Sequence, residues 1–111
     1  MPQIQTDLIV QTLDLETPET CFVLYVPRRD KYVAEIGSGE VPGKLILFWD
    51  SKEAAQRFVT QNKLLETHDV PAITVRHMCF DSLRDLARSR GVVGIRDYRY
   101  ALLPNYGVYY V

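Results

Sequence analysis

The fold is decided by the stretch LILFWDSKE at residues 45–53, where an apolar run meets a polar one. Five consecutive apolar residues between polar flanks predict a strand in the middle of a sheet. The residues that follow predict a helix start, with Asp50 accepting hydrogen bonds from first-turn amides and Glu53 reaching back as in a capping box. The stretch therefore predicts a strand that passes directly into a helix.

Two amphipathic helices are expected after this strand. The first keeps apolar residues at helical spacing until about Leu65. The second covers residues 82–90, with Asp81 as its N-cap. Gly91 stands where a left-handed residue commonly ends a helix.

Further strands complete the pattern. Residues 72–76 read as a strand, and residues 45–76 are therefore expected to form a right-handed parallel crossover. Residues 22–26 and 32–36 read as the two strands of a hairpin, and residues 95–102 as a C-terminal strand. Optional short strands lie near the two termini, at 8–10 and 108–111.

Together these segments predict an α+β fold built as a two-layer sandwich. Its mixed sheet has about five strands, with two helices on one face, in the order β-β-β-α-β-α-β. Residues 1–20 carry acidic side chains and no lysine or arginine, so they form an acidic lead-in with at most one short strand. Residues 21–111 form a single domain.

Composition narrows the class of protein. The chain has 111 residues, 47% hydrophobic and 24% charged, which fits one globular domain whose core needs no metal or disulfide. No run approaches the roughly 20 apolar residues of a membrane span, and no signal peptide is expected. The net charge of −1 does not indicate a polyanion partner. Cys21 and Cys79 each precede a phenylalanine and are expected to be buried, reduced thiols of a cytoplasmic protein.

The same segments resemble a small family of uncharacterised proteins found in cyanobacteria and plastids. The resemblance rests on LILFW at 45–49, SKEAAQRF at 51–58, VPAITV at 70–75 and the segment from Phe80 to Gly91, roughly two-thirds of the chain. The strand–Ser-x-Glu-Ala–helix pattern is also similar to that of the enhanced-serine-sensitivity protein family. Both resemblances imply a small accessory domain and supply no catalytic residue. The first twenty residues and the Tyr- and Arg-rich C-terminus depart from both families.

Three motifs with potential chemistry have simpler structural explanations. The segment GSGEVPGK at 37–44 lacks the spacing of a phosphate-binding loop and precedes a strand. His77 and Cys79 could form a nucleophile pair or half a metal site, but a structural histidine and a core cysteine are favoured. Asp81 and Asp85 are explained as a helix cap and an ion-pair partner. We therefore expect no catalytic residue, no metal site and no cofactor.

The C-terminal segment holds the candidate binding residues. In a strand over 95–102, Arg96, Tyr98 and Tyr100 share one face and Arg99 lies on the other. Such residues can pack on the sheet, bind a protein or stack single-stranded bases. We hypothesise a non-catalytic protein-interaction or regulatory module that binds a protein partner or itself through sheet surface and this segment, using Arg96, Tyr98, Arg99, Tyr100, Tyr106 and Tyr109. The alternative is weak single-stranded nucleic-acid binding through the first four of these residues.

Overall fold

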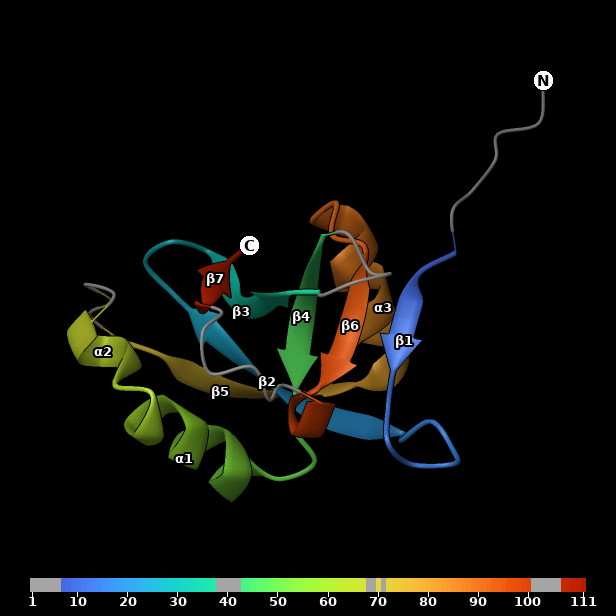
Figure 1. The fold of residues 1–111 in the computed structure, drawn as a ribbon, viewed down its shortest axis with the longest axis horizontal. Coiled ribbons are helices and arrows are strands. Elements are labelled where there is room, and N and C mark those ends of the chain that lie inside the picture. The colour runs from blue at the N-terminus through green and yellow to red at the C-terminus, as the bar shows by residue number, and fades with distance from the viewer. Residues whose placement is uncertain (1–6, 38–42, 68–69, 71, 101–106) are drawn as a thin grey trace.

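The computed structural model describes residues 7–37, 43–67, 70, 72–100 and 107–111, which form a mixed α+β fold (Figure 1). The α+β class and the mixed sheet agree with the prediction, although these residues hold seven strands and a third, short α-helix. Residues 38–42 of the predicted loop and Tyr106 lie outside the described residues. The elements are β1 (Ile9–Gln11), β2 (Thr20–Val26), β3 (Lys31–Ile36), β4 (Lys44–Phe48), α1 (Lys52–Gln61), α2 (Leu64–Thr67), β5 (Thr74–Cys79), α3 (Phe80–Ser89), β6 (Gly94–Asp97), the 3-10 turn η1 (Tyr98–Tyr100) and β7 (Tyr109–Tyr110).

The sheet has the strand order β1-β6-β4-β3-β2-β5, and β7 also pairs with β3. β2 pairs with the start of β3, at Lys31 and Tyr32, whereas β4 pairs with residues 34–36. An antiparallel bridge between Phe22 and Trp49 then joins β2 directly to the end of β4, with backbone N···O distances of 2.8 and 2.9 Å. The sheet is therefore bent, and β2 and β5 run across the direction of β4 and β6 (Figure 1).

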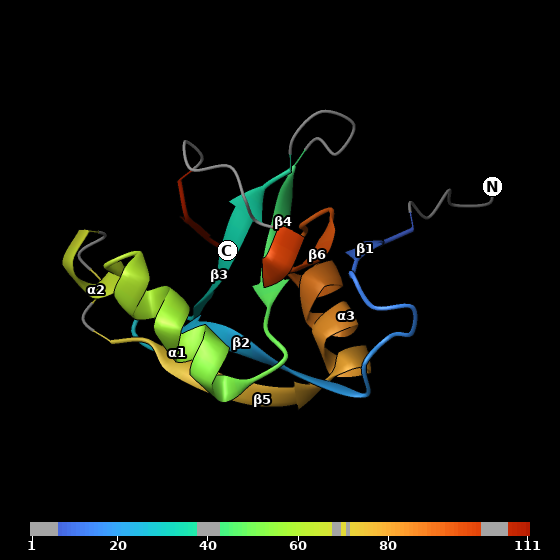
Figure 2. The same ribbon diagram turned by 60° about the horizontal axis from the view of Figure 1, so that its bottom comes forward.

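The predicted placement of both main helices on one face is wrong. Phe48 packs in a buried cluster with Phe80 of α3, whereas Trp49 packs in a second cluster with Ala55 of α1. Because neighbouring residues of a strand point to opposite faces, α1 and α3 cover opposite faces of the sheet. In Figure 2, α1 lies over β2 and β5, and α3 lies beside β6. The physical reason is that every residue in the run at 45–49 is apolar, so both faces need a cover.

The predicted parallel crossover between residues 45 and 76 is also wrong. β5 starts at Thr74, extends to Cys79 and pairs antiparallel with β2. It cannot pair with β4, because β3 and β6 occupy the two edges of that strand. The parallel pairs are instead β4 with β6 and β1 with β6, so the short strand of the N-terminal lead-in forms one end of the sheet.

The helix ends follow the predicted capping in part. Ser51, not Asp50, is the N-cap of α1, and its Oγ accepts a backbone amide hydrogen at 3.1 Å. Cys79 is the N-cap of α3 without a side-chain hydrogen bond, which places Asp81 inside the helix. Gly91 has a φ of +68°, as predicted for the residue that ends the helix. The N-cap of α1 therefore lies one residue later than predicted, and that of α3 lies two residues earlier.

The first predicted helix is split in two. α1 ends at Gln61, Lys63 adopts a φ of +50°, and α2 begins at Leu64. Leu64 is fully buried in the cluster that α1 covers. The break therefore turns the chain back onto the core before Leu65, where a single helix was predicted to end.

Gly94 occupies a position in β6 where β1 leaves no room for a side chain. A Cβ at this position would stand 2.1 Å from the backbone oxygen of Ile9. We expect Gly94→Ala to lower the free energy of unfolding by about 3 kcal/mol, the upper end of overpacking costs. The control Gly107→Ala, whose Cβ meets nothing within 4 Å, should change it by less than about 0.5 kcal/mol. Urea unfolding measures both, and equal stabilities would contradict the close approach of β1 and β6.

Candidate interaction surfaces

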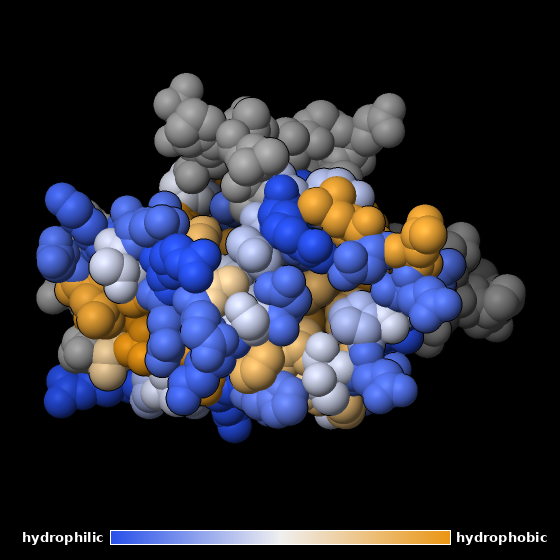
Figure 3. Space-filling model, turned by 90° about the horizontal axis from the view of Figure 1, so that it is seen from below, coloured by the Kyte–Doolittle hydropathy of each residue, from blue (hydrophilic) through white to orange (hydrophobic). Residues whose placement is uncertain are grey.

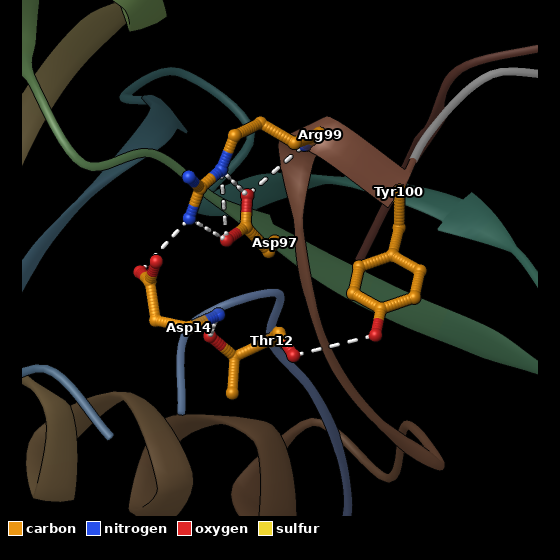
Figure 4. Close-up of polar contacts among 5 residues, drawn as sticks. All are labelled: Thr12, Asp14, Asp97, Arg99 and Tyr100. Atoms are coloured by element: carbon orange, nitrogen blue, oxygen red, sulfur yellow. Dashed lines mark hydrogen bonds and ion pairs between the residues drawn. The ribbon is translucent and has the colours of Figure 1, made fainter. Parts of the chain in front are cut away.

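The Arg- and Tyr-rich segment is not a continuous strand. β6 ends at Asp97, and the next three residues form η1. Asp97 Oδ1 accepts a hydrogen bond from the backbone N–H of Arg99 at 3.0 Å, as Figure 4 shows. Such local side-chain bonds compete with a strand ladder. The predicted strand is therefore confirmed at 95–97 and wrong at 98–100, whereas 101–102 lie outside the described residues; the common face of Arg96, Tyr98 and Tyr100 is also wrong.

Arg99 binds two carboxylates from distant parts of the chain. Its Nε lies 3.0 and 3.2 Å from the two oxygens of Asp97, and its Nη2 lies 2.9 Å from Asp14 Oδ2 (Figure 4). The hydrogen bonds that Arg99 donates to Asp97 and Asp14 raise the pKa of its guanidinium above its ordinary value. Because Asp97 is buried, this cluster ties the connection between β1 and β2 to the end of β6.

Arg96 is buried beside a second carboxylate. It is 7% exposed, its Nε donates to Gln11 Oε1 at 2.7 Å, and its Nη1 lies 3.7 Å from Glu35 Oε2. Burial raises the pKa of Glu35, and the charge of Arg96 partly opposes that rise. Sequence analysis did not identify Glu35 or Asp97 as a carboxylate in a buried ion pair. For Asp97, the available signal was its place between Arg96 and Arg99, shortly after the apolar residue Ile95.

The C-terminal tyrosines also contact the chain itself. Tyr98 stacks on Trp49, with ring centroids 6.0 Å apart and an interplanar angle of 19°. Tyr100 is 40% exposed, and its hydroxyl donates to the Thr12 carbonyl oxygen at 3.3 Å (Figure 4). Tyr109 pairs with β3 through β7. The predicted binding residues therefore fasten terminal segments to the sheet, and Tyr100 is the most exposed of those that the structure describes.

A groove of about 370 Å³ lies between α1 and β5. We call it the α1–β5 groove. Its lining comes from α1 through Lys52, Gln56, Val59 and Thr60, and from the β5 side through Ile73, Thr74 and Val75. Figure 3 views the molecule from the side of α1 and β5, and shows apolar surface among hydrophilic side chains toward the end where α2 lies. Sequence analysis did not predict this groove, because it depends on the pairing of β5 with β2.

β5 also presents a row of outward-facing backbone groups. Among the strands that the structure describes, β5 pairs with β2 alone. His77 stands opposite Phe22, whose N–H and C=O both bond to Trp49 on the other side of β2. The N–H and C=O of His77 therefore face away from β2, and those of Val75 do the same because ladder bonds alternate. We call this row the outer edge of β5, and it adjoins the α1–β5 groove.

The two cysteines lie in opposite environments. Cys21 is 1% exposed, and burial raises the pKa of its thiol to about 12. Cys79 is exposed, so its prediction as a core thiol is wrong; its Sγ lies 2.9 Å from Ser82 Oγ, and this hydrogen bond lowers its pKa. The His77 ring stacks on Phe22 with centroids 4.6 Å apart. The thiol and the imidazole thus have different partners and are not joined as a nucleophile and its base.

Comparison with family models, curated proteins and solved structures finds no match to this chain. The resemblance to the cyanobacterial and plastid family, and to enhanced-serine-sensitivity proteins, therefore stays a prediction. Within the described ranges, no group of three or more His, Cys, Asp or Glu side chains is placed to hold a metal ion. None of the helices in this part of the chain has the length and apolar character needed to cross a membrane.

The buried acid of the Arg99 cluster should matter more for stability than the exposed one. We expect Asp97→Asn to lower the free energy of unfolding by about 3 kcal/mol, because the buried network loses its negative charge and one of its two acceptor oxygens. Asp14→Asn removes the exposed partner and should cost less than about 1 kcal/mol. Urea unfolding of the two variants tests this difference. Small and equal losses would show that the cluster does not hold the connection between β1 and β2 to the end of β6.

Cys79 should react with iodoacetamide well before Cys21 in the folded protein. Because its pKa is lowered, Cys79 forms thiolate at a lower pH than a free cysteine, whose pKa is about 8.5. Cys21 is buried, its pKa is raised to about 12, and it stays protonated. Mass spectrometry after labelling at several pH values between about 6 and 9 should show one modified cysteine, with both modified in urea. The variant Cys79→Ser should remove the native-state labelling. Equal labelling of both thiols in native buffer would disprove the difference in environment.

Proposed function

We propose that this chain is a protein-binding module without catalytic chemistry of its own. An extended segment of a partner protein adds as a further strand to the outer edge of β5, and some of its side chains enter the α1–β5 groove. The observation that carries this proposal is the position of the outward-facing backbone groups of Val75 and His77 beside that groove. In strand addition, backbone hydrogen bonds supply affinity and side-chain pockets supply specificity.

The two ends of the sheet differ in their protection against strand addition. β1 has three residues, and natural proteins use such short strands to blunt an edge. β5 has six residues and contains neither proline nor lysine, which commonly protect an edge strand. The greater length and the open backbone of β5 support it as the site of pairing.

The Tyr- and Arg-rich segment is a weaker candidate for binding a partner. Arg96 and Arg99 pair with carboxylates of this chain, and Tyr98 packs on Trp49. To bind phosphates, both arginines would have to give up these ion pairs. The geometry therefore does not favour the single-stranded nucleic-acid alternative.

A different protein fits the outer edge of β5 better than a second copy of this chain. β5 contains Arg76 and His77 and no acidic residue. Antiparallel pairing of two β5 strands with Arg76 opposite Arg76 would bring two like charges close together, and neither strand has an acid to offset them. For this reason the proposed partner is heterologous.

The proposal predicts where selected peptides bind. The probe is a display library of random peptides of about ten residues, long enough to pair along a strand, selected against the whole chain. Each selected peptide is then located by amide chemical-shift changes in the ¹⁵N-labelled protein, with the largest changes expected at Val75, His77 and α1. A library that yields no binder, or binders that shift Tyr98–Tyr100 instead, would contradict strand addition at β5.

Two tryptophan variants on α1 serve as matched controls for this experiment. Gln56 lines the α1–β5 groove and Glu53 does not, although both side chains are exposed. Gln56→Trp should fill the groove and weaken binding of the selected peptides about tenfold, the equivalent of about 1.4 kcal/mol. Glu53→Trp should leave the affinity unchanged, and thermal unfolding checks that both variants fold. Equal affinities of the two variants would remove the groove from the binding site.

A further inference from the structure

The side chains of β5 point alternately to two different surfaces. Val75 packs in the cluster that α1 covers, and Ile73, just before the strand, packs in the same cluster. Arg76 instead contacts Tyr25 and Tyr32, which belong to the cluster on the α3 face. A strand added to β5 would therefore meet apolar side chains and the groove on one face and Arg76 on the other.

Arg76 is held in place by aromatic side chains. Its guanidinium carbon lies 4.5 Å from the Tyr25 ring centroid, and its Nη1 donates to the Tyr32 hydroxyl oxygen at 2.6 Å. Asp30, the acid of the neighbouring hairpin, pairs with Arg90 and accepts the hydroxyl hydrogen of Tyr25. Arg76 is thus fixed by neutral partners that leave other guanidinium donors for a further acceptor.

Arg76 forms no ion pair in the part of the chain that the structure describes, unlike the arginines that follow it, although its charge contributes to lowering the pKa of Asp30. Each of the arginines at 84, 88, 90, 96 and 99 lies within ion-pair distance of an aspartate or glutamate. Among the residues that the structure describes, no carboxylate lies within that distance of Arg76. A preorganised guanidinium beside an open strand edge is complementary to a carboxylate on the added strand.

On the other face of the added strand, the α1–β5 groove selects apolar side chains. Val59, Ile73 and Val75 supply its apolar surface, and Lys52 is the charged residue of its lining. Within the described residues, no acidic side chain contributes to this lining. The groove therefore favours apolar side chains and tolerates a negative charge at the Lys52 end.

We infer that the segment added to β5 alternates apolar and acidic side chains, with the apolar ones in the α1–β5 groove and the acidic ones beside Arg76. This inference rests on the proposed strand addition. Because strand side chains alternate, one such segment satisfies both surfaces at once. A slip by one residue would place acids against Val59 and Val75, so the same alternation sets the register.

The inference is tested with two capped peptides, TVEVEVT and TVKVKVT, titrated into the ¹⁵N-labelled whole chain. TVEVEVT should bind about tenfold more tightly than TVKVKVT, shift the amides of Val75 and His77, and lose affinity as salt is raised. Arg76→Gln should weaken TVEVEVT about fivefold, and Arg76→Glu should reverse the preference between the peptides. Arg57→Glu, the same charge change on α1 outside the groove lining, should preserve the preference.

The outcomes separate this inference from the proposed function. If both peptides bind equally and shift the amides of β5, strand addition holds and the acidic pattern is overturned. If neither peptide binds while library-selected peptides still shift β5, the inferred pattern is again overturned. A preference that survives Arg76→Glu would rule out Arg76 as the acceptor of the acid. Should either Arg76 variant fail to fold, the salt dependence and the peptide preference of the unmodified protein decide the question.

Discussion

The bend of the sheet depends on the antiparallel bridge between Phe22 and Trp49. This bridge draws β2 across the end of β4, while successive parts of β3 pair with both strands. The second edge of β2 is then available to β5, which becomes an end strand of the sheet. α1 begins just after Trp49 and is therefore placed over β2 and β5. The α1–β5 groove and the outer edge of β5 both follow from this one pairing.

Charged side chains have two separate roles in this arrangement. Arg96 and Arg99 lie at or beside buried positions, and their acidic and amide partners connect β1, β3 and β6. The charges of these two arginines are paired within the molecule, and the pairs help to hold these strands together. Arg76 lies at the sheet end and is held by the rings of Tyr25 and Tyr32. That difference in partners, rather than the number of basic residues, separates a structural arginine from one suited to binding.

The sequence predicted elements best where local pattern and burial agree. The run at 45–49 is apolar throughout and forms β4, and the apolar spacing after it forms α1. The strand prediction was wrong at 98–100, because the Asp97 side chain accepts a hydrogen bond from the Arg99 amide and the chain turns. Arg96, Tyr98 and Tyr100, which were predicted to form one binding face, therefore do not share a strand face. The α1–β5 groove could not be predicted at all, since its two walls are separated in sequence and meet only through the pairing of β2 with β5.

By itself, the sequence determined the segments that become strands and helices, since side-chain periodicity and the left-handed residue at Gly91 are local properties. Residues 45–49 also offer no polar face, although sequence analysis placed both helices on one side of the sheet. Only the tertiary structure decided which strand each segment pairs with, on which face each helix lies, and that Arg96 and Asp97 are buried. Those outcomes depend on competition for strand edges between residues far apart in the chain, and no local pattern encodes that competition.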